Sequence, residues 1–447
     1  MSMVGGERRR GRRSTATATL ARHGRLKRRG PWRSVLRFVV AGVAVVAISA
    51  VSITAITVWD LSSTLTSHTI HLVDAKGKPV VPAVDSLKGA FNVLLVGTDT
   101  RTGQGSGYGA LTESEGAGQN DVTILLHVSA NHNRATVVSY PRDMFVSVPS
   151  CPRPQGGFSP AQVGRKINTT LIDGGLSCTV LTVEQLTGVT IPYAAEVTFD
   201  GVIAMSDAVG GVPVCVSGTI NDSHTHLHLT SGEHTLVGKE ALQFLRTRHG
   251  VGDGSDLGRI SNQQVFLSSL MRTIMARGTL TNISKVYGLA KAAATNMRLS
   301  DSLNISTLAS MAVAMRHIDL SKVTFVQYPT TIVPGGVDAL QPAGNLLSQA
   351  IQHDQPITLT SGTGAPRVGS VVKGSSSSSS SGAKASTSGG SSTGSASSGS
   401  SAPPASSAKG ASPAPTPQAS APPSVVLPHG VYGQTATEQT CSRAFDF

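Results

Sequence analysis

A run of 21 residues without a charged side chain, residues 38–58, constrains the fold of this chain more than any other feature. A helix of that length spans about 31 Å, which is close to the hydrocarbon thickness of a bilayer. No A-x-A cleavage pattern follows the run, and the run is longer than the apolar core of a signal peptide. We therefore predict an uncleaved transmembrane anchor. The alternative is a buried core helix.

The positive charge of the chain is concentrated before this run. Residues 1–37 contain 12 Lys and Arg residues and a single acidic residue, Glu7, so they carry nearly all of the net charge of +12. The positive-inside rule places this tail in the cytoplasm and the residues after the anchor outside the cell. Charge confined to a tail argues against a nucleic-acid-binding domain, whose basic residues lie on the folded surface. We expect the tail to set the topology and to contact anionic lipids.

The four cysteines, Cys151, Cys178, Cys215 and Cys441, all follow the predicted anchor. Outside the cell disulfides persist, and four cysteines allow three pairings. No CxxC spacing is present, which argues against a zinc site. Our hypothesis is that Cys151 pairs with Cys178 in a local loop. Cys441 lies far from the other cysteines in sequence, so we pair it with Cys215.

Composition divides the remaining chain into four parts: a juxtamembrane stalk (59–87), a folded body (88–362), a Ser-, Gly-, Ala- and Pro-rich linker (363–424) and a segment with renewed apolar content (425–447). The linker contains seven consecutive serines and cannot bury enough apolar area to fold. We expect it to be a disordered spacer. The last segment either docks on the body or frays.

The body mixes strand and helix patterns, which predicts an α/β or α+β domain built around one mixed sheet. A continuous apolar run at 91–97 has strand length and ends in glycine, and two further strand patterns form a hairpin. Asp256 resembles the N-cap of a long helix. The predicted strands are 91–97, 121–129, 134–140, 212–217 and 322–328, and the predicted helices are 177–187, 197–209, 238–246, 256–276, 282–295 and 301–316.

Charged side chains gather where the predicted strands begin or end. Asp99, Asp121 and Asp143 lie at such positions, and ligands of α/β sheets bind outside strand ends. Guanidinium groups match phosphate oxygens, and paired carboxylates hold Mg²⁺ or Mn²⁺. Together they suit a pyrophosphate group; the alternative is that they cap turns and form surface ion pairs. The remaining candidates for this site are Arg101, Arg142, Lys166, Arg246, Arg248, Arg259 and Gln263.

A second pattern, His224, His226 and His228, alternates as a strand does, so the three imidazoles are expected to share one face. Such a face could bind Zn²⁺, although no carboxylate or cysteine nearby completes the set. The alternative is a polar hairpin face. The chain has no P-loop, GxSxG or HExxH motif.

Several segments of the body resemble the LytR–CpsA–Psr (LCP) family of Gram-positive cell-wall enzymes, and the sequence is most similar to the actinobacterial branch. The resemblance covers roughly residues 88–362, and the motifs follow the order of the family. They are FNVLLVGTDTR, NDVTILLHVSANHNRATVVSYPRDMFVSVPSC, KINTTLIDGG, GGVPVCV and GKEALQFLRTRHG followed by DLGRISNQQ.

This resemblance implies a three-layer α/β/α domain that transfers a phosphoglycan from a polyprenyl-pyrophosphate carrier to peptidoglycan with Mg²⁺ or Mn²⁺. It implies that Asp99 and Asp121 supply the metal ligands and the base. It also implies that Asp143 and Gln263 occupy supporting polar positions, that Lys166 is the basic residue of a family motif, and that Arg142 is among the catalytic residues. The residues assigned to pyrophosphate binding are Arg101, Arg142, Lys166, Arg246, Arg248, Arg259 and Gln263.

The chain departs from the family pattern at one position. Gln119 stands where many relatives carry arginine, and Arg101 is the residue that could substitute for it. Two other functions stay open at this point. One is a phosphatase or pyrophosphatase that acts on lipid pyrophosphates with water as the acceptor. The other is a non-catalytic envelope scaffold or a transcriptional attenuator.

Overall fold

The computed structural model describes residues 69–83, 85–102, 104, 116–276, 282–360, 370–372 and 423–445, together with some positions between 32 and 64. Most of the predicted anchor and nearly all of the predicted linker lie outside these residues. Within the described part of the chain, no helix combines the length and the apolar character needed to cross a bilayer.

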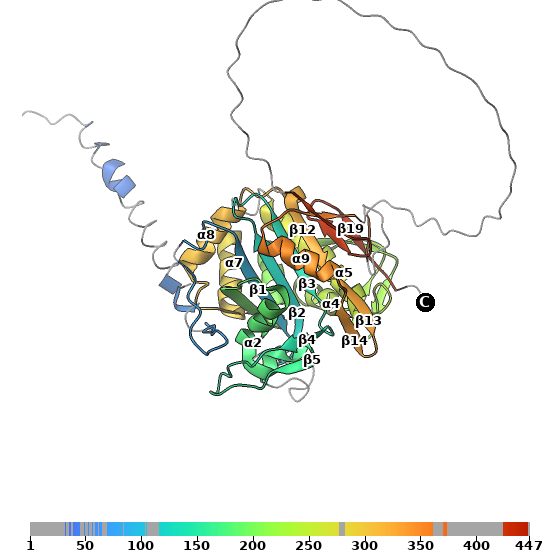
Figure 1. Ribbon diagram of the computed structural model, residues 1–447. Coiled ribbons are helices and arrows are strands. Elements are labelled where there is room, and N and C mark those ends of the chain that lie inside the picture. Colours follow the sequence, from blue (N-terminus) through green and yellow to red (C-terminus); the bar gives the residue numbers. More distant parts are fainter. Residues whose placement is uncertain are drawn as a thin grey trace, which may run out of the picture. The chain divides into compact units, whose positions relative to one another are not determined.

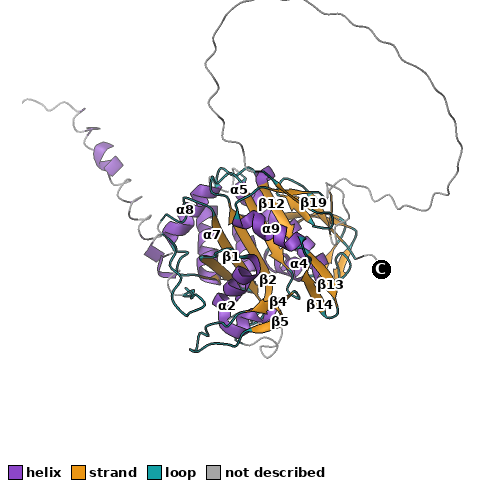
Figure 2. Cartoon of the chain, viewed as in Figure 1, coloured by secondary structure: helices purple, strands orange, loops and turns teal. Residues whose placement is uncertain are grey.

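A seven-stranded mixed sheet forms the centre of the body (Figures 1 and 2). Strand β1 pairs in parallel with β6, and β3 pairs in parallel with β12, whereas the other neighbours are antiparallel. The predicted hairpin is therefore β2–β3. In spatial order the strands are β11 (Met297–Leu299), β6 (Tyr193–Val197), β1 (Phe91–Thr98), β2 (Asn120–Val128), β3 (Ala135–Tyr140), β12 (Val323–Gln327) and β18 (Gly433–Thr435).

Helices cover both faces of this sheet. Successive residues of β1 point to opposite sides, so Leu94 packs with α2 (Thr170–Thr187) and α9 (Ala343–Gln352), whereas Leu95 packs on the other side. Burial on both faces explains why the strand is a continuous apolar run rather than an alternating one. The helices on the side of Leu95 are α3 (Phe199–Val209), α5 (Asp256–Met275), α7 (Ile283–Asn296) and α8 (Ile305–Met315).

A second sheet of four strands packs against α5 and α4 (Gly238–Arg246) around a separate apolar cluster. Its strands are, in order, β10 (Gly232–Leu236), β7 (Val212–Ser217), β19 (Thr440–Arg443) and β16 (Ser370–Val372). Shorter elements complete the body: β4 (Phe145–Val148) with β5 (Gln162–Lys166), β8 (Ile220–Asp222) with β9 (Leu227–Leu229), β13 (Thr330–Val333) with β14 (Gly336–Ala339), η2 (Ile167–Thr169) and η3 (Leu320–Lys322).

The C-terminal segment docks on the body, which decides between the two outcomes that the sequence left open. Its first strand, β17 (Val425–Leu427), pairs in parallel with β15 (Ile357–Leu359). Strand β18 then joins the edge of the central sheet, and β19 pairs in parallel with β7. This segment therefore contributes to both sheets.

Two disulfides join the four cysteines in the pairing that we inferred from the sequence. Cys151 bonds to Cys178 across 27 residues, and Cys215 bonds to Cys441 across 226 residues. The first bond leaves little space around Gly174, where a Cβ atom would lie 2.8 Å from the Cβ of Cys151. A glycine is needed there because any side chain would collide with the disulfide.

The predicted starts of three helices and the predicted cap of α5 were wrong. Helix α3 begins at Phe199 rather than 197. Helix α2 begins at Thr170 rather than 177, but its backbone is not helical at Gly174 and Gly175, and the part after this kink matches the predicted helix. Ser255, not Asp256, is the N-cap of α5, because its hydroxyl accepts the N–H of Gly258. Helix α8 begins at Ile305, with Asn304 as its cap, rather than at 301.

Candidate active site

Asp99 directly follows β1, at the end of the sheet where β1 meets the start of β2. Its amide donates to the carbonyl of Gln119, and its carboxylate accepts the N–H of Gln119 at 2.6 Å. This close approach depends on Gly118, which has φ +68°; a Cβ atom there would lie 2.8 Å from the Asp99 carboxylate and 2.5 Å from the nitrogen of Thr100. The backbone therefore fixes Asp99 beside β2.

Asp121, the second residue of β2, is held between two arginines. Its Oδ1 accepts from Arg142 Nη1 at 2.6 Å, and its Oδ2 lies 3.8 Å from Arg259 Nη1. Asp256 joins the same network, because its carboxylate accepts the backbone N–H of Arg142 at 3.2 Å and contacts Arg259 Nη2 at 2.5 Å. These interactions connect strand β2 with the turn after β3 and with the first turn of α5.

A second ion pair follows in the same turn. Asp143 contacts Lys166, at the end of β5, with Oδ1 and Nζ 3.0 Å apart. Burial alone would raise the pKa of Asp143, but the Lys166 hydrogen bond and the charges of Arg142, Lys166 and Arg248 outweigh it and lower the pKa. Burial opposes the charged form of Arg142 as well, yet the carboxylates of Asp121, Asp143 and Asp256 raise its pKa. Both groups are therefore charged at neutral pH.

Arg246, the last residue of α4, lies opposite this network and is held differently. Its guanidinium carbon lies 4.4 Å from the centre of the Phe199 ring, a cation–π contact. In the part of the chain that the structure describes, no carboxylate forms an ion pair with it. Burial lowers the pKa of Arg246, the charges of Arg101 and Arg259 act in the same direction, and Asp121 and Asp99 oppose them. Arg246 is thus a partly buried cation near two carboxylates that do not neutralise it.

The remaining predicted residues surround these groups. Arg248 Nε donates to the carbonyl of Gly254 at 3.3 Å, and its charge acts on Asp143. Gln263 of α5 donates from Nε2 to the carbonyl of Leu245 at 3.1 Å, so it fixes the end of α4 that carries Arg246. The side chain of Gln119 accepts from Asn168 Nδ2 at 2.8 Å. The structure therefore brings all of the predicted site residues into one region around the start of β2.

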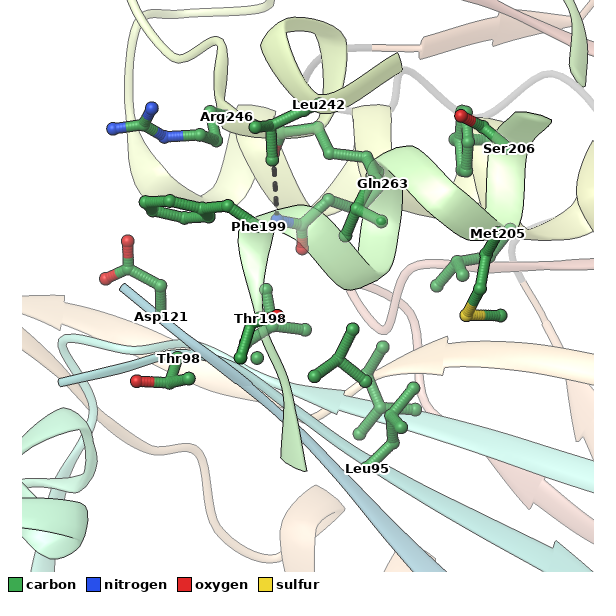
Figure 3. Close-up of a pocket in the computed structure, with 18 of the residues that line it drawn as sticks. Leu95, Thr98, Asp121, Thr198, Phe199, Met205, Ser206, Leu242, Arg246 and Gln263 are labelled. Carbon is green, nitrogen blue, oxygen red and sulfur yellow. Dashed lines mark hydrogen bonds between the residues drawn. The ribbon is translucent and has the colours of Figure 1, made fainter. Parts of the chain in front are cut away.

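An apolar cavity of about 150 Å³ opens beside this cluster, between the central sheet and helices α3, α4 and α5 (Figure 3). Asp121, Arg246 and Phe199 lie at one end in the close-up, whereas Leu95 and Met205 lie farther inside. The three hydroxyl groups in the wall are already satisfied, and that of Thr98 donates to the carbonyl of Ala117. That of Thr198 donates to the carbonyl of Asn296, and that of Ser206 donates to the carbonyl of Ile203. The cavity thus offers charge at one end and only apolar contact farther in.

Asp99 and Asp121 are the carboxylates that a hard divalent cation in this region would use. The two residues adjoin the paired residues Thr98 and Asn120 on neighbouring strands, and carboxylate oxygens are the ligands that Mg²⁺ prefers. Among the described residues, no group of three or more His, Cys, Asp and Glu side chains could hold a metal ion. Two carboxylates are nevertheless a common protein contribution for Mg²⁺, which takes its other ligands from water and phosphate oxygens.

Of the two interpretations of the histidine pattern, the structure shows the polar hairpin and not the shared strand face. His224 and His226 lie in the turn between β8 and β9, and His226 has φ +56°, so only His228 belongs to a strand. The rings of His224 and His249 are 4.4 Å apart instead. The three imidazoles therefore do not share a strand face.

Sequence reasoning missed three residues of the site. Asp256 was assigned to a helix cap, although its position one turn before Arg259 indicates an i,i+3 ion pair. Phe199 and Asn168 gave no usable signal, because a lone aromatic residue and a lone amide are common in any domain. Asn168 contacts Gln119 only through the tertiary fold.

Comparison with known proteins points to one family. The sequence model of the LytR_cpsA_psr family matches residues 57–353. The chain is 30% identical over 329 residues to "Cell wall biosynthesis protein LcpA" of Corynebacterium glutamicum, which covers 68% of this chain and 61% of that protein. It is 28% identical over 214 residues to "Polyisoprenyl-teichoic acid--peptidoglycan teichoic acid transferase TagT" of Bacillus subtilis, which covers 46% of this chain and 60% of that protein.

The chain thus spans about three fifths of the length of these two relatives. Among solved structures, the "LytR-Csp2A-Psr enzyme from Actinomyces oris" is 20% identical and has a TM-score of 0.47. The match covers 64% of this chain and 96% of that one.

Proposed function

Because the chain belongs to the LytR_cpsA_psr family, as its motifs indicated, we propose that it transfers a phosphoglycan from a polyprenyl-pyrophosphate carrier to peptidoglycan during cell wall assembly. The relative from Bacillus subtilis carries a name for a transfer of this type, from a polyisoprenyl-linked polymer to peptidoglycan. The relative from Corynebacterium glutamicum is named as a cell wall biosynthesis protein.

One observation carries the proposal: an apolar cavity has arginines and a carboxylate at one end. A polyprenyl pyrophosphate has the matching polarity, because a hydrocarbon chain adjoins a group with several negative charges. The cavity wall would remove the first part of the chain from water, a transfer worth about 0.8 kcal/mol for each buried methylene. Arg246 and Arg259 at the same cavity would then face the diphosphate.

The chemistry follows from these positions. The acceptor hydroxyl attacks the phosphorus that carries the glycan, a new P–O bond forms, and the bond to the lipid phosphate breaks, so that polyprenyl phosphate leaves. A carboxylate of the pair Asp99 and Asp121 accepts the proton of the hydroxyl. Arg142, Arg246 and Arg259 stabilise the charge that spreads over the phosphoryl oxygens. Asp99 and Asp121 would hold Mg²⁺ or Mn²⁺, which neutralises charge on the pyrophosphate.

We assign the same arrangement to the envelope that the sequence predicts. Residues 38–58 anchor the chain, residues 1–37 lie in the cytoplasm, and the body lies outside, where its two disulfides persist. The predicted stalk (59–87) is shorter than we expected, because Leu72 is buried in the core of the body and Ile70 pairs with Ser300. We assign residues 363–424 as a linker and the body as a three-layer α/β/α domain. The anchor keeps the site at the membrane surface, where the lipid-linked donor is found.

The test is to incubate the full chain in detergent with a synthetic lipid-linked donor, peptidoglycan and Mg²⁺. We expect a covalent glycan–peptidoglycan product, and we expect Arg142→Ala and Asp99→Ala each to abolish it while circular dichroism stays unchanged. Free phosphate without that product would identify a hydrolase instead. Full turnover in both variants would reject the site.

A deletion of the basic tail distinguishes an enzyme from a non-catalytic scaffold. Removal of residues 1–30 leaves the predicted anchor in place, so an enzyme keeps its turnover in the assay above. Loss of a cellular function with full turnover in that variant would assign that function to the tail.

A further inference from the structure

Two adjacent turns and a neighbouring strand carry apolar side chains that are exposed in the described part of the chain. Phe158, which closes a turn by bridging to Pro152, is 51% exposed, and Val163 of β5 is 88% exposed. The turn at 74–78 lies against the turn that contains Phe158, because a Cβ atom on Gly77 would be 3.4 Å from the Phe158 ring. Exposed apolar side chains beside cations are the side-chain types that bind an anionic membrane interface.

Four exposed cations belong to the same turns and strand: Lys76, Lys78, Arg153 and Arg165. We name these four residues, with Phe158 and Val163, the loop patch. Across the residues that the structure describes, none of the four cations forms an ion pair. The carboxylate of Asp74 accepts the backbone N–H groups of Lys76 and Lys78 at 2.8 Å each. Cations therefore outnumber carboxylates in the loop patch, where the charge of Asp74 acts on Lys76 and Lys78.

The loop patch shares strand β5 with the candidate active site. Arg165 directly precedes Lys166, whose ammonium group contacts Asp143, and successive side chains of a strand point to opposite faces. Helix α2 adjoins the turn that carries Arg153, because a Cβ atom on its Gly175 would lie 3.5 Å from Pro154. Figure 1 shows β4, β5 and α2 together at the lower edge of the folded body. A ligand that binds the loop patch would thus lie against the strand that carries Lys166 of the site.

We propose that the loop patch docks on the anionic headgroups of the outer leaflet and holds the active site against the bilayer. This inference rests on the proposed function, because a lipid-linked donor is reached only at the membrane surface. Each cation near an anionic surface favours binding about fivefold, and apolar side chains such as Phe158 and Val163 insert at the interface. Only 17 residues separate Lys76 from the predicted anchor, a span of at most about 60 Å.

The experiment uses the full chain in proteoliposomes and a single tryptophan reporter. The chain has two tryptophans, Trp32 and Trp59, so the reporter chain combines Trp32→Phe, Trp59→Phe and Val163→Trp. We expect bromine-labelled phosphatidylglycerol to quench its emission more than bromine-labelled phosphatidylcholine does. Adding Arg153→Glu and Arg165→Glu should lower the ratio of docked to undocked chain by about 25-fold or more, because two cations are lost.

The matched control reverses two exposed cations elsewhere, Lys291→Glu and Lys322→Glu, and should leave the quenching unchanged. Equal quenching by the two lipids, or in the patch and control variants, would overturn the proposal. So would a patch variant that keeps its quenching but no longer sediments with peptidoglycan, since the loop patch would then bind the acceptor. Turnover of a short-chain donor in detergent tests the proposed function separately, because that reaction needs no bilayer.

Discussion

The cations on the two sides of the candidate active site are held in opposite ways. On the strand side, Arg142 and Lys166 each contact a carboxylate, at 2.6 Å and 3.0 Å. On the α4 side, Arg246 lies over the ring of Phe199 and has no carboxylate partner among the described residues. The pKa shifts follow this difference, because neighbouring carboxylates raise the pKa of Arg142 despite its burial, whereas burial lowers the pKa of Arg246.

The difference separates two tasks that one set of arginines performs. A cation that is paired within the protein fixes the geometry, but its charge is already partly neutralised. A partly buried cation without a partner destabilises the fold, yet its full charge is available to an anionic ligand. We infer that the strand side positions the diphosphate and that the α4 side supplies most of the attraction.

The sharpest test of this comparison is Arg246→Ala. We expect kcat/KM for the lipid-linked donor to fall by about 10²–10³-fold, the range for removal of one group that stabilises developing charge. The free energy of unfolding should change little, because losing the cation–π contact with Phe199 is offset by removing a partly buried charge that has no carboxylate partner. Urea unfolding and kinetics on the same samples measure both, with Lys239→Ala, an exposed residue at the other end of α4, as the control. A clear loss of stability would contradict the distinction.

A smaller effect is expected from Gln119→Arg, which restores the arginine of many relatives. The substitution removes the hydrogen bond from Asn168 and adds a cation beside Asp99. We expect the affinity for the donor to rise about tenfold, the low end of what one additional charge-assisted hydrogen bond contributes. Titration with a non-transferable diphosphate analogue measures it. Gln119→Ala removes the same hydrogen bond without adding charge, so an equal gain in that variant would exclude the electrostatic explanation.

The smallest effect concerns the pair of Asp143 and Lys166. The pKa of Asp143 is lowered in the folded chain, so the pair stabilises the fold above the ordinary carboxyl pKa of about 4 and loses that contribution as pH falls through the folded value. Lys166→Met should therefore cost about 0.5–1 kcal/mol at pH 7, a modest amount because both groups are partly exposed.

Urea unfolding of wild type and Lys166→Met at pH 7 and at pH 3 measures this contribution. The difference between the two proteins should shrink at the lower pH. A difference that stays constant would show that Lys166 acts through packing on Phe145, whose ring centre lies 6.0 Å from its ammonium group, and not through charge.

Local patterns predicted much of the fold. Helix α4 and strand β7 have the predicted bounds, and the hairpin β2–β3 follows two strand patterns that a short polar turn joins. Glycine misled the prediction at α2, because Gly174 and Gly175 interrupt its geometry without ending it. Local propensity could not show that Gly174 lies against the disulfide of Cys151 and Cys178.

Local patterns also predicted which residues belong to the site. Asp99, Asp121 and Arg142 stand at strand ends, and the chemistry of carboxylates and guanidinium groups indicates a phosphate ligand wherever they meet. The partners of each group depend on contacts that are remote in sequence. Arg142 and Arg259, for example, are separated by more than 100 residues and share Asp121 only because α5 packs against the start of β2.

The sequence by itself determined the inventory: an apolar run of membrane length, a basic tail, four cysteines and a set of arginines and aspartates in family motifs. Only the tertiary structure decided which arginine is paired and which is left for a ligand, where the apolar cavity lies, and that the last segment completes both sheets. Hydropathy and charge are properties of single residues and short windows, and they can be read along the chain. Pairing, burial and cavities arise when distant segments meet in space, and no local pattern encodes them.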